Sequence, residues 1–162
     1  MSAENNNENN TQEQELWERI STTEGMERAE VLDELSYIAY RRDDFNECLQ
    51  LVDTSIDIYF KLGMDSHIKE LIHAYEGKAF SLRNLDRHAE AADTFEEIAK
   101  LHQIDDDTHG YMKAIRAAAC DWYEVKEWQK CLDGHTAAKD SIDPDATPMS
   151  MGIDLLNIGM AL

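Results

Sequence analysis

The sequence contains few of the residues that interrupt helices. Only 7 glycines and 2 prolines occur among its 162 residues, while alanine, leucine, glutamate and aspartate are abundant. This composition favours helices over a many-stranded sheet. The length suits one domain of ordinary size, and a hydrophobic share of 43% is enough for a core. We therefore expect an all-α protein.

Basic residues are also scarce. The chain has 15 lysines and arginines against 34 aspartates and glutamates, which gives a formal net charge of −19. Such a chain repels phosphate backbones, so binding to nucleic acid through a basic surface is excluded as an expected function. It gains nothing from an anionic membrane surface, and we expect no membrane partner. Basic partners should be attracted to it.

Cysteines and long apolar runs are few or missing. An odd number of cysteines, namely Cys48, Cys120 and Cys131, argues against a disulfide framework and for a reducing cytoplasm. No apolar run reaches membrane-spanning length. Residues 1–11 are rich in asparagine and glutamate and have no lysine or arginine, so they are not a signal peptide. We predict a cytoplasmic protein with a disordered tail over 1–11 and one helical domain over 12–162.

Motifs for catalysis are missing as well. The chain has no HExxH, Walker or GxGxxG sequence. The best candidate for a metal site is HQIDDDTHG at 102–110, but it lies where a connection between helices is expected, and aspartate commonly caps helices. We therefore predict no catalytic residue, no bound metal and no cofactor.

What the sequence does contain is a repeat. A small residue followed four positions later by a large one occurs at Cys48, Ala91 and Cys131. A large residue opens each segment just after a turn, with spacings of 43 and 40 residues between Phe45, His88 and Trp128. The small residues Ser36, Ala79 and Ala119 repeat upstream at the same offsets, and Gly159 follows 40 residues later.

The repeat predicts three helix-turn-helix units and the first helix of a fourth. The first helices are expected at 26–42, 67–84, 108–124 and from 148. The second helices are expected at 45–62, 86–103 and 126–142. A short helix near 12–21 would cover the open end of the first unit.

The pattern of small residues at these repeated positions resembles that of the tetratricopeptide repeat. The second unit carries the resemblance most clearly, at Tyr75, Ala79, Leu82, Ala91, Phe95 and Ile98. The units are longer than the family's usual length of about 34 residues, and look like those of kinesin light chains and of bacterial peptide-sensing regulators. Lys78 stands where the family has leucine. The resemblance implies a right-handed α-solenoid with a concave groove.

In tetratricopeptide proteins the first helices of each unit line that groove. The resemblance therefore implies groove positions that combine aromatic rings with arginines, which are the residue types of binding hot spots. These candidate partner-binding residues are Tyr37, Tyr40, Phe80, Arg83, Arg116 and Tyr123. The two arginines would be available for carboxylates or a peptide C-terminus. The alternative interpretation is that the rings are partly buried between helices.

The function that follows is a non-catalytic scaffold or adaptor that binds a protein or peptide in the groove. Two alternatives remain: a small acidic chaperone that holds a client protein, and an acidic mimic of nucleic acid that occupies a DNA-binding protein. The apolar segment 148–162 is expected to mediate self-association, or to be covered by further chain.

Overall fold

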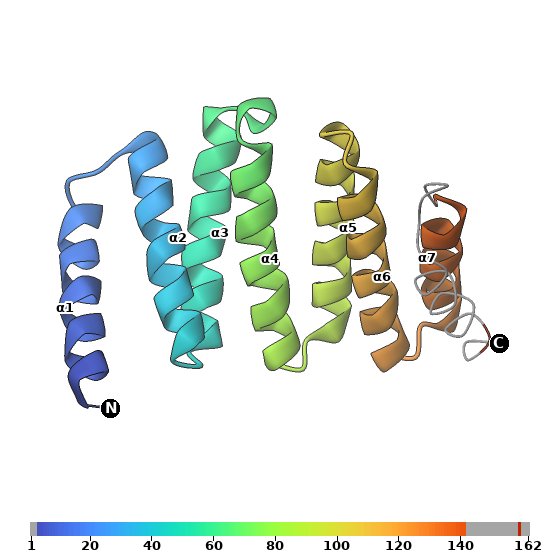
Figure 1. Ribbon diagram of the computed structural model, residues 1–162, viewed down its shortest axis with the longest axis horizontal. Helices are drawn as coiled ribbons and strands as arrows, with labels where there is room; N and C mark the ends of the chain where they lie inside the picture. The colour runs from blue at the N-terminus through green and yellow to red at the C-terminus, as the bar shows by residue number, and fades with distance from the viewer. Residues whose placement is uncertain (1–2, 142–158, 160–162) are drawn as a thin grey trace. The chain divides into compact units, whose positions relative to one another are not determined.

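The computed structural model describes residues 3–141 and residue 159. This part of the chain contains seven α-helices, one short 3₁₀ helix and no strand, which confirms the all-α prediction. The helices, in chain order (Figure 1), are α1 Ala3–Ile20, α2 Gly25–Arg41, α3 Phe45–Leu62, η1 Met64–Ser66, α4 Ile68–Asn84, α5 His88–Ile104, α6 Thr108–Glu124 and α7 Trp128–Asp140.

The bounds of α2 to α7 lie within two residues of those predicted from the repeat. By contrast, α1 begins at Ala3, well before the expected start near 12, since no glycine or proline occurs between 4 and 20 to stop the helix. Disorder of residues 1–11 in solution stays a prediction. The helix expected from 148, and the self-association assigned to 148–162, lie outside the described residues apart from Gly159, which is helical.

By its internal contacts the chain divides into two compact units, residues 1–81 and 82–162. The assignment of residues 12–162 to one helical domain stays a prediction. Helical repeats pack mainly on their neighbours, so an array of them has no single central core. In the first unit α1, α2 and α3 share a core that includes Leu16, Leu35 and Val52. In the second unit α6 packs on both α5 and α7.

The small residues of the repeat lie where helices pack, as predicted. Cys48, Ala91 and Cys131 are at most 1% exposed, and their large partners four residues later are also buried. Helices α6 and α7 come so close that a Cβ added at Gly134 would lie 2.9 Å from the Cβ of Ala119. The predicted repeat positions are therefore packing positions. Cys120 is the exposed thiol, again as predicted.

The turn inside each repeat has the same backbone structure three times. One residue of each turn has a positive φ: 63° at Asp43, 55° at Asp86 and 62° at Lys126. The next amide N–H reaches back to a carbonyl oxygen near the end of the preceding helix, in the pairs Asp44 to Ala39, Arg87 to Leu82 and Glu127 to Trp122, at 2.9–3.0 Å. This is the Schellman motif, which stops a helix without proline. It recurs at the 43- and 40-residue spacings of the sequence repeat.

Lys126 is the least suited residue at these three positions, because aspartate tolerates the left-handed region better than lysine does. We expect Lys126→Gly to raise the free energy of unfolding of the second unit by about 1 kcal/mol, measured by urea denaturation. The neighbouring Val125 has a φ of −90°, so Val125→Gly should lower it instead. Equal effects of the two substitutions would contradict this account of the turn.

Candidate functional site

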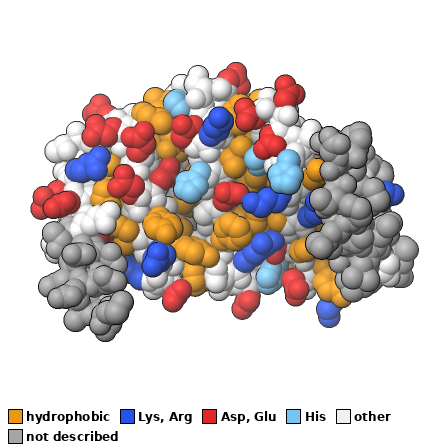
Figure 2. All heavy atoms as spheres, in the orientation of Figure 1, with side chains coloured by type: hydrophobic (Ala, Val, Ile, Leu, Met, Phe, Trp, Pro, Cys, Tyr) orange, Lys and Arg blue, Asp and Glu red, His pale blue; other side chains and the backbone are white. Residues whose placement is uncertain are grey.

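Five of the six candidate residues line two separate hollows, one in each unit. Tyr37, Tyr40 and Phe80 line a pocket in the first unit, and Arg83 and Arg116 line a cleft in the second. Tyr123 belongs to neither set of lining residues, and its ring packs edge-on against Trp128 at 5.2 Å. On the face shown in Figure 2, hydrophobic side chains reach the surface among acidic and basic ones.

Most of the candidate rings are exposed. Tyr37, Phe80 and Tyr123 have exposed fractions of 58%, 41% and 40%. The alternative of partial burial applies to Tyr40, which is half-buried and packs edge-on against Phe45 at 5.5 Å. Large exposed rings that surround a hollow are typical of binding surfaces.

The hollow in the first unit, here called the aromatic pocket, has a volume of about 380 Å³. Helices α2 and α4 supply most of the lining residues. Within each helix these residues are mostly three or four positions apart, so they lie on one face of the helix. Helix α3 contributes two further residues. The lining residues are Asp33, Ser36, Tyr37, Tyr40, Cys48, Val52, His73, Ala74, Glu76, Gly77 and Phe80.

Gly77 helps to keep this pocket open. It lies inside helix α4, where glycine is less favourable than alanine by about 1 kcal/mol. A Cβ at this position would meet the Cγ1 of Val52 at 3.5 Å, an ordinary contact. A methyl group would therefore fit, whereas a longer side chain would project into the pocket and fill it.

Asp33 is the most unusual polar group of the pocket. Its Oδ2 accepts a 2.6 Å hydrogen bond from the hydroxyl of Tyr59 in α3, a residue only 1% exposed. Its Oδ1 is buried and has no hydrogen-bond partner within the described part of the chain. Burial raises the pKa of Asp33 above its ordinary value, although the nearby hydroxyl groups of Ser55 and Tyr59 act in the opposite direction. His73 and Glu76 of α4 line the pocket together with Asp33.

The hollow in the second unit, here called the arginine cleft, has a volume of about 430 Å³. Its lining residues come from the end of α4, the start of α5 and from α6. They are Arg83, His88, Arg116, Ala117, Cys120, Asp121 and Glu124.

Within this cleft Arg83 is already engaged by the protein. Its Nε donates to both carboxylate oxygens of Asp121, at 3.0 and 2.8 Å, and its terminal nitrogen donates to the Ala117 carbonyl at 2.9 Å. The guanidinium also lies 4.3 Å from the centre of the Phe95 ring. In this structure the guanidinium of Arg83 is therefore already paired within the chain, and its role in binding a partner stays a prediction. A buried carboxylate is stable only when it is paired with a cation, and the Arg83 guanidinium is the cation that pairs with Asp121.

Asp121 was not among the functional residues predicted from the sequence. Its side chain is only 3% exposed, and the Nδ1 of His88 lies 3.0 Å from its Oδ1. The available signal was a single acid inside the alanine-rich stretch RAAACDW of α6. An isolated charge on an otherwise apolar helix face indicates a partner elsewhere in the fold, but does not say which one.

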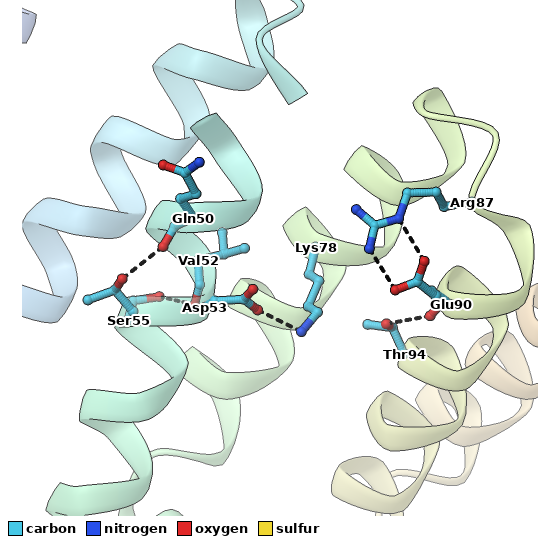
Figure 3. A network of polar contacts seen from close by, with 9 residues as sticks. Gln50, Val52, Asp53, Ser55, Lys78, Arg87, Glu90 and Thr94 are labelled. Atoms are coloured by element: carbon cyan, nitrogen blue, oxygen red, sulfur yellow. Dashed lines mark hydrogen bonds and ion pairs between the residues drawn. The ribbon is translucent and has the colours of Figure 1, made fainter. Parts of the chain in front are cut away.

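Two other polar contacts belong to the surface (Figure 3). Lys78, at the position where the tetratricopeptide pattern has leucine, reaches from α4 to Asp53 of α3 at 2.6 Å. Separately, Arg87, which precedes α5, pairs with Glu90 in the first turn of that helix through two hydrogen bonds. Exposed pairs of this kind contribute little to stability.

The stretch HQIDDDTHG forms a turn and a helix start. Asp107 caps α6 by accepting a 2.9 Å hydrogen bond from the backbone N–H of Gly110, and this bond lowers the pKa of Asp107. The other carboxylate oxygen of Asp107 lies 2.9 Å from the Nδ1 of His102. In the part of the chain that the structure describes, no group of three or more histidine, cysteine, aspartate or glutamate residues could hold a metal. Within the same part, no helix is long and apolar enough to cross a membrane.

Comparison with solved structures supports the repeat fold. The chain superposes on the apo form of RapI, a tetratricopeptide-like helical repeat protein, with a TM-score of 0.71 and 14% sequence identity. The match covers 88% of this chain but only 39% of RapI, so the chain spans about two fifths of that protein's length. No protein-family model and no curated protein sequence matches the chain. At this identity the likeness concerns the fold alone: the chain is an all-α solenoid of tetratricopeptide-like helix pairs.

Proposed function

We propose that this protein is a non-catalytic scaffold that binds a protein or peptide, and that the aromatic pocket is part of its binding surface. The observation that carries the proposal is the set of rings around the pocket. Tyr37 and Phe80 expose large parts of their surface beside a hollow with an apolar floor of Cys48 and Val52. Concave apolar surfaces with a few polar groups are the usual form of a binding site.

The arrangement of the pocket also suits recognition of a side chain. Its rings belong to helices α2 and α4. Helix α2 packs on α3 in the core of the first unit, and the contact between Lys78 and Asp53 joins α4 to α3. Rigid rings lose little conformational entropy on binding, which is one reason why tyrosine is enriched among binding hot spots. The cleft of the second unit is less suited to this role, because Arg83 is committed to Asp121.

A selection from a library of random peptides would test the proposal. Peptides that bind the full chain should lose affinity about tenfold or more for Phe80→Ala and for Tyr37→Ala. The pocket-filling substitution Gly77→Leu should have the same effect without removing any ring. Binding would be measured by fluorescence anisotropy, and circular dichroism would check that each variant is folded.

Phe60→Ala is the matched control. Phe60 is 47% exposed on α3 of the same unit and does not line the pocket, so this substitution should leave the affinity unchanged. The proposal fails if no peptide is enriched, or if the enriched peptides bind the three pocket variants as well as they bind the parent chain.

A further inference from the structure

The charged side chains that line the aromatic pocket are mainly acidic. Its lining includes the carboxyl groups of Asp33 and Glu76, and His73 is its one group of basic type; among the described residues no lysine or arginine lines it. Glu30 adds negative potential at Asp33, while His73 acts in the opposite direction. The whole chain carries a formal charge of −19, so its long-range field also favours a cation.

The rings around the pocket suit the same kind of ligand. The face of an aromatic ring carries negative charge density and attracts an ammonium or guanidinium group. The protein already uses this attraction at Tyr37, since the guanidinium of Arg41 lies 5.9 Å from the centre of that ring and donates to its hydroxyl. Arg41 is not among the residues that line the pocket.

From these observations we propose that the aromatic pocket receives a lysine side chain of the partner polypeptide. The stem of the lysine would pack against the rings of Tyr37, Tyr40 and Phe80, and its ammonium would lie near the carboxylates of Asp33 and Glu76. This proposal rests on the proposed function and specifies the partner's chemistry. Because the Asp33 carboxyl group is half-buried in the lining of the pocket, its attraction for a cation is screened less than that of an exposed carboxylate.

The geometry favours lysine over arginine. Arginine pairs best with a carboxylate when both oxygens accept from its fork of N–H groups. In Asp33 the Oδ2 already accepts from the Tyr59 hydroxyl, at 2.6 Å. A lysine ammonium is a compact point charge that needs only one oxygen.

The test uses three small probes, N-acetyl-lysine N-methylamide and its arginine and norleucine counterparts, titrated into the full chain and followed by NMR. Norleucine keeps most of the lysine stem and lacks the charge. The lysine probe should bind about tenfold more tightly than the norleucine probe, and more tightly than the arginine probe. Asp33→Asn and Glu76→Gln should each reduce the preference for lysine over norleucine.

Asp57→Asn is the control, because Asp57 is exposed on α3 of the same unit and does not line the pocket. It removes one charge elsewhere and should leave the preference intact. A second readout is the pKa of Asp33 itself, measured by NMR. The lysine probe should lower this pKa, since a nearby positive charge stabilises the carboxylate, whereas the norleucine probe should not lower it.

The possible outcomes separate this proposal from the function on which it rests. Equal binding of lysine and norleucine, tighter binding of arginine, or a lysine preference that survives both Asp33→Asn and Glu76→Gln would each overturn the lysine proposal. If all three probes bind equally and Gly77→Leu abolishes their binding, the pocket still receives side chains and the proposed function stands. If no probe shifts the resonances of the pocket, the lysine proposal is overturned, and the peptide selection decides the proposed function independently.

Discussion

Asp121→Ala is expected to lower the free energy of unfolding of the second unit by about 3 kcal/mol, measured by urea denaturation with far-ultraviolet circular dichroism. The carboxylate is nearly inaccessible, and it is the partner of both Arg83 and His88. Its removal leaves the Arg83 guanidinium, itself only 28% exposed, without its anionic partner. Breaking a buried pair in this way is more destabilising than replacing the whole pair.

Two comparisons make this prediction specific. Glu90→Ala removes a carboxylate from the exposed pair with Arg87 in the same unit, and should cost less than about 1 kcal/mol. The double variant Arg83→Met/Asp121→Leu should recover part of the loss, because two apolar side chains can replace a buried ion pair. If the losses for Asp121→Ala and Glu90→Ala were equal, the pair with Arg83 would not be a significant source of stability.

The role of Asp121 changes how a variant of Arg83 must be interpreted. Because Arg83 is a candidate partner-binding residue from the sequence, Arg83→Glu would be expected to abolish partner binding. In the structure this substitution would bring a second carboxylate to Asp121, and the repulsion would destabilise the second unit. A loss of partner binding in Arg83→Glu therefore needs a parallel measurement of stability before it is assigned to the binding surface.

Ala91→Leu is expected to lower the free energy of unfolding by about 1–3 kcal/mol, because it forces extra atoms into a close contact between helices. Ala91 is fully buried, so the additional atoms of leucine have no open space to enter. Ala89→Leu is a matched control: it makes the same change two residues earlier on the same helix, where the side chain is exposed. The control should change stability by no more than about 0.5 kcal/mol.

Both variants would be followed by thermal and urea denaturation. If Ala91→Leu left the melting temperature unaltered, the assignment of Ala91 to the helix–helix contact would be wrong. A similar loss in the control would instead indicate that leucine is unfavourable anywhere in this part of α5.

The repeat and its packing positions were determined by the sequence alone. Small residues at a constant offset are a local signal, because they mark where one helix must approach the next. For this reason the bounds of α2 to α7, the burial of Cys48, Ala91 and Cys131, and the exposure of Cys120 could all be predicted. The start of α1 was less predictable, since the polar residues before 12 carry no packing signal.

Only the tertiary structure decided which polar groups meet. Arg83 and Asp121 are 38 residues apart in sequence, and Asp33 and Tyr59 are 26 apart. Such pairs depend on the rotation of each helix about its axis and on the distance between helices, and a one-dimensional spacing specifies neither closely enough. The tertiary structure likewise placed the six candidate residues at a pocket, a cleft and an aromatic contact. It was their packing, and not their residue types, that left the aromatic pocket open and engaged Arg83 within the protein.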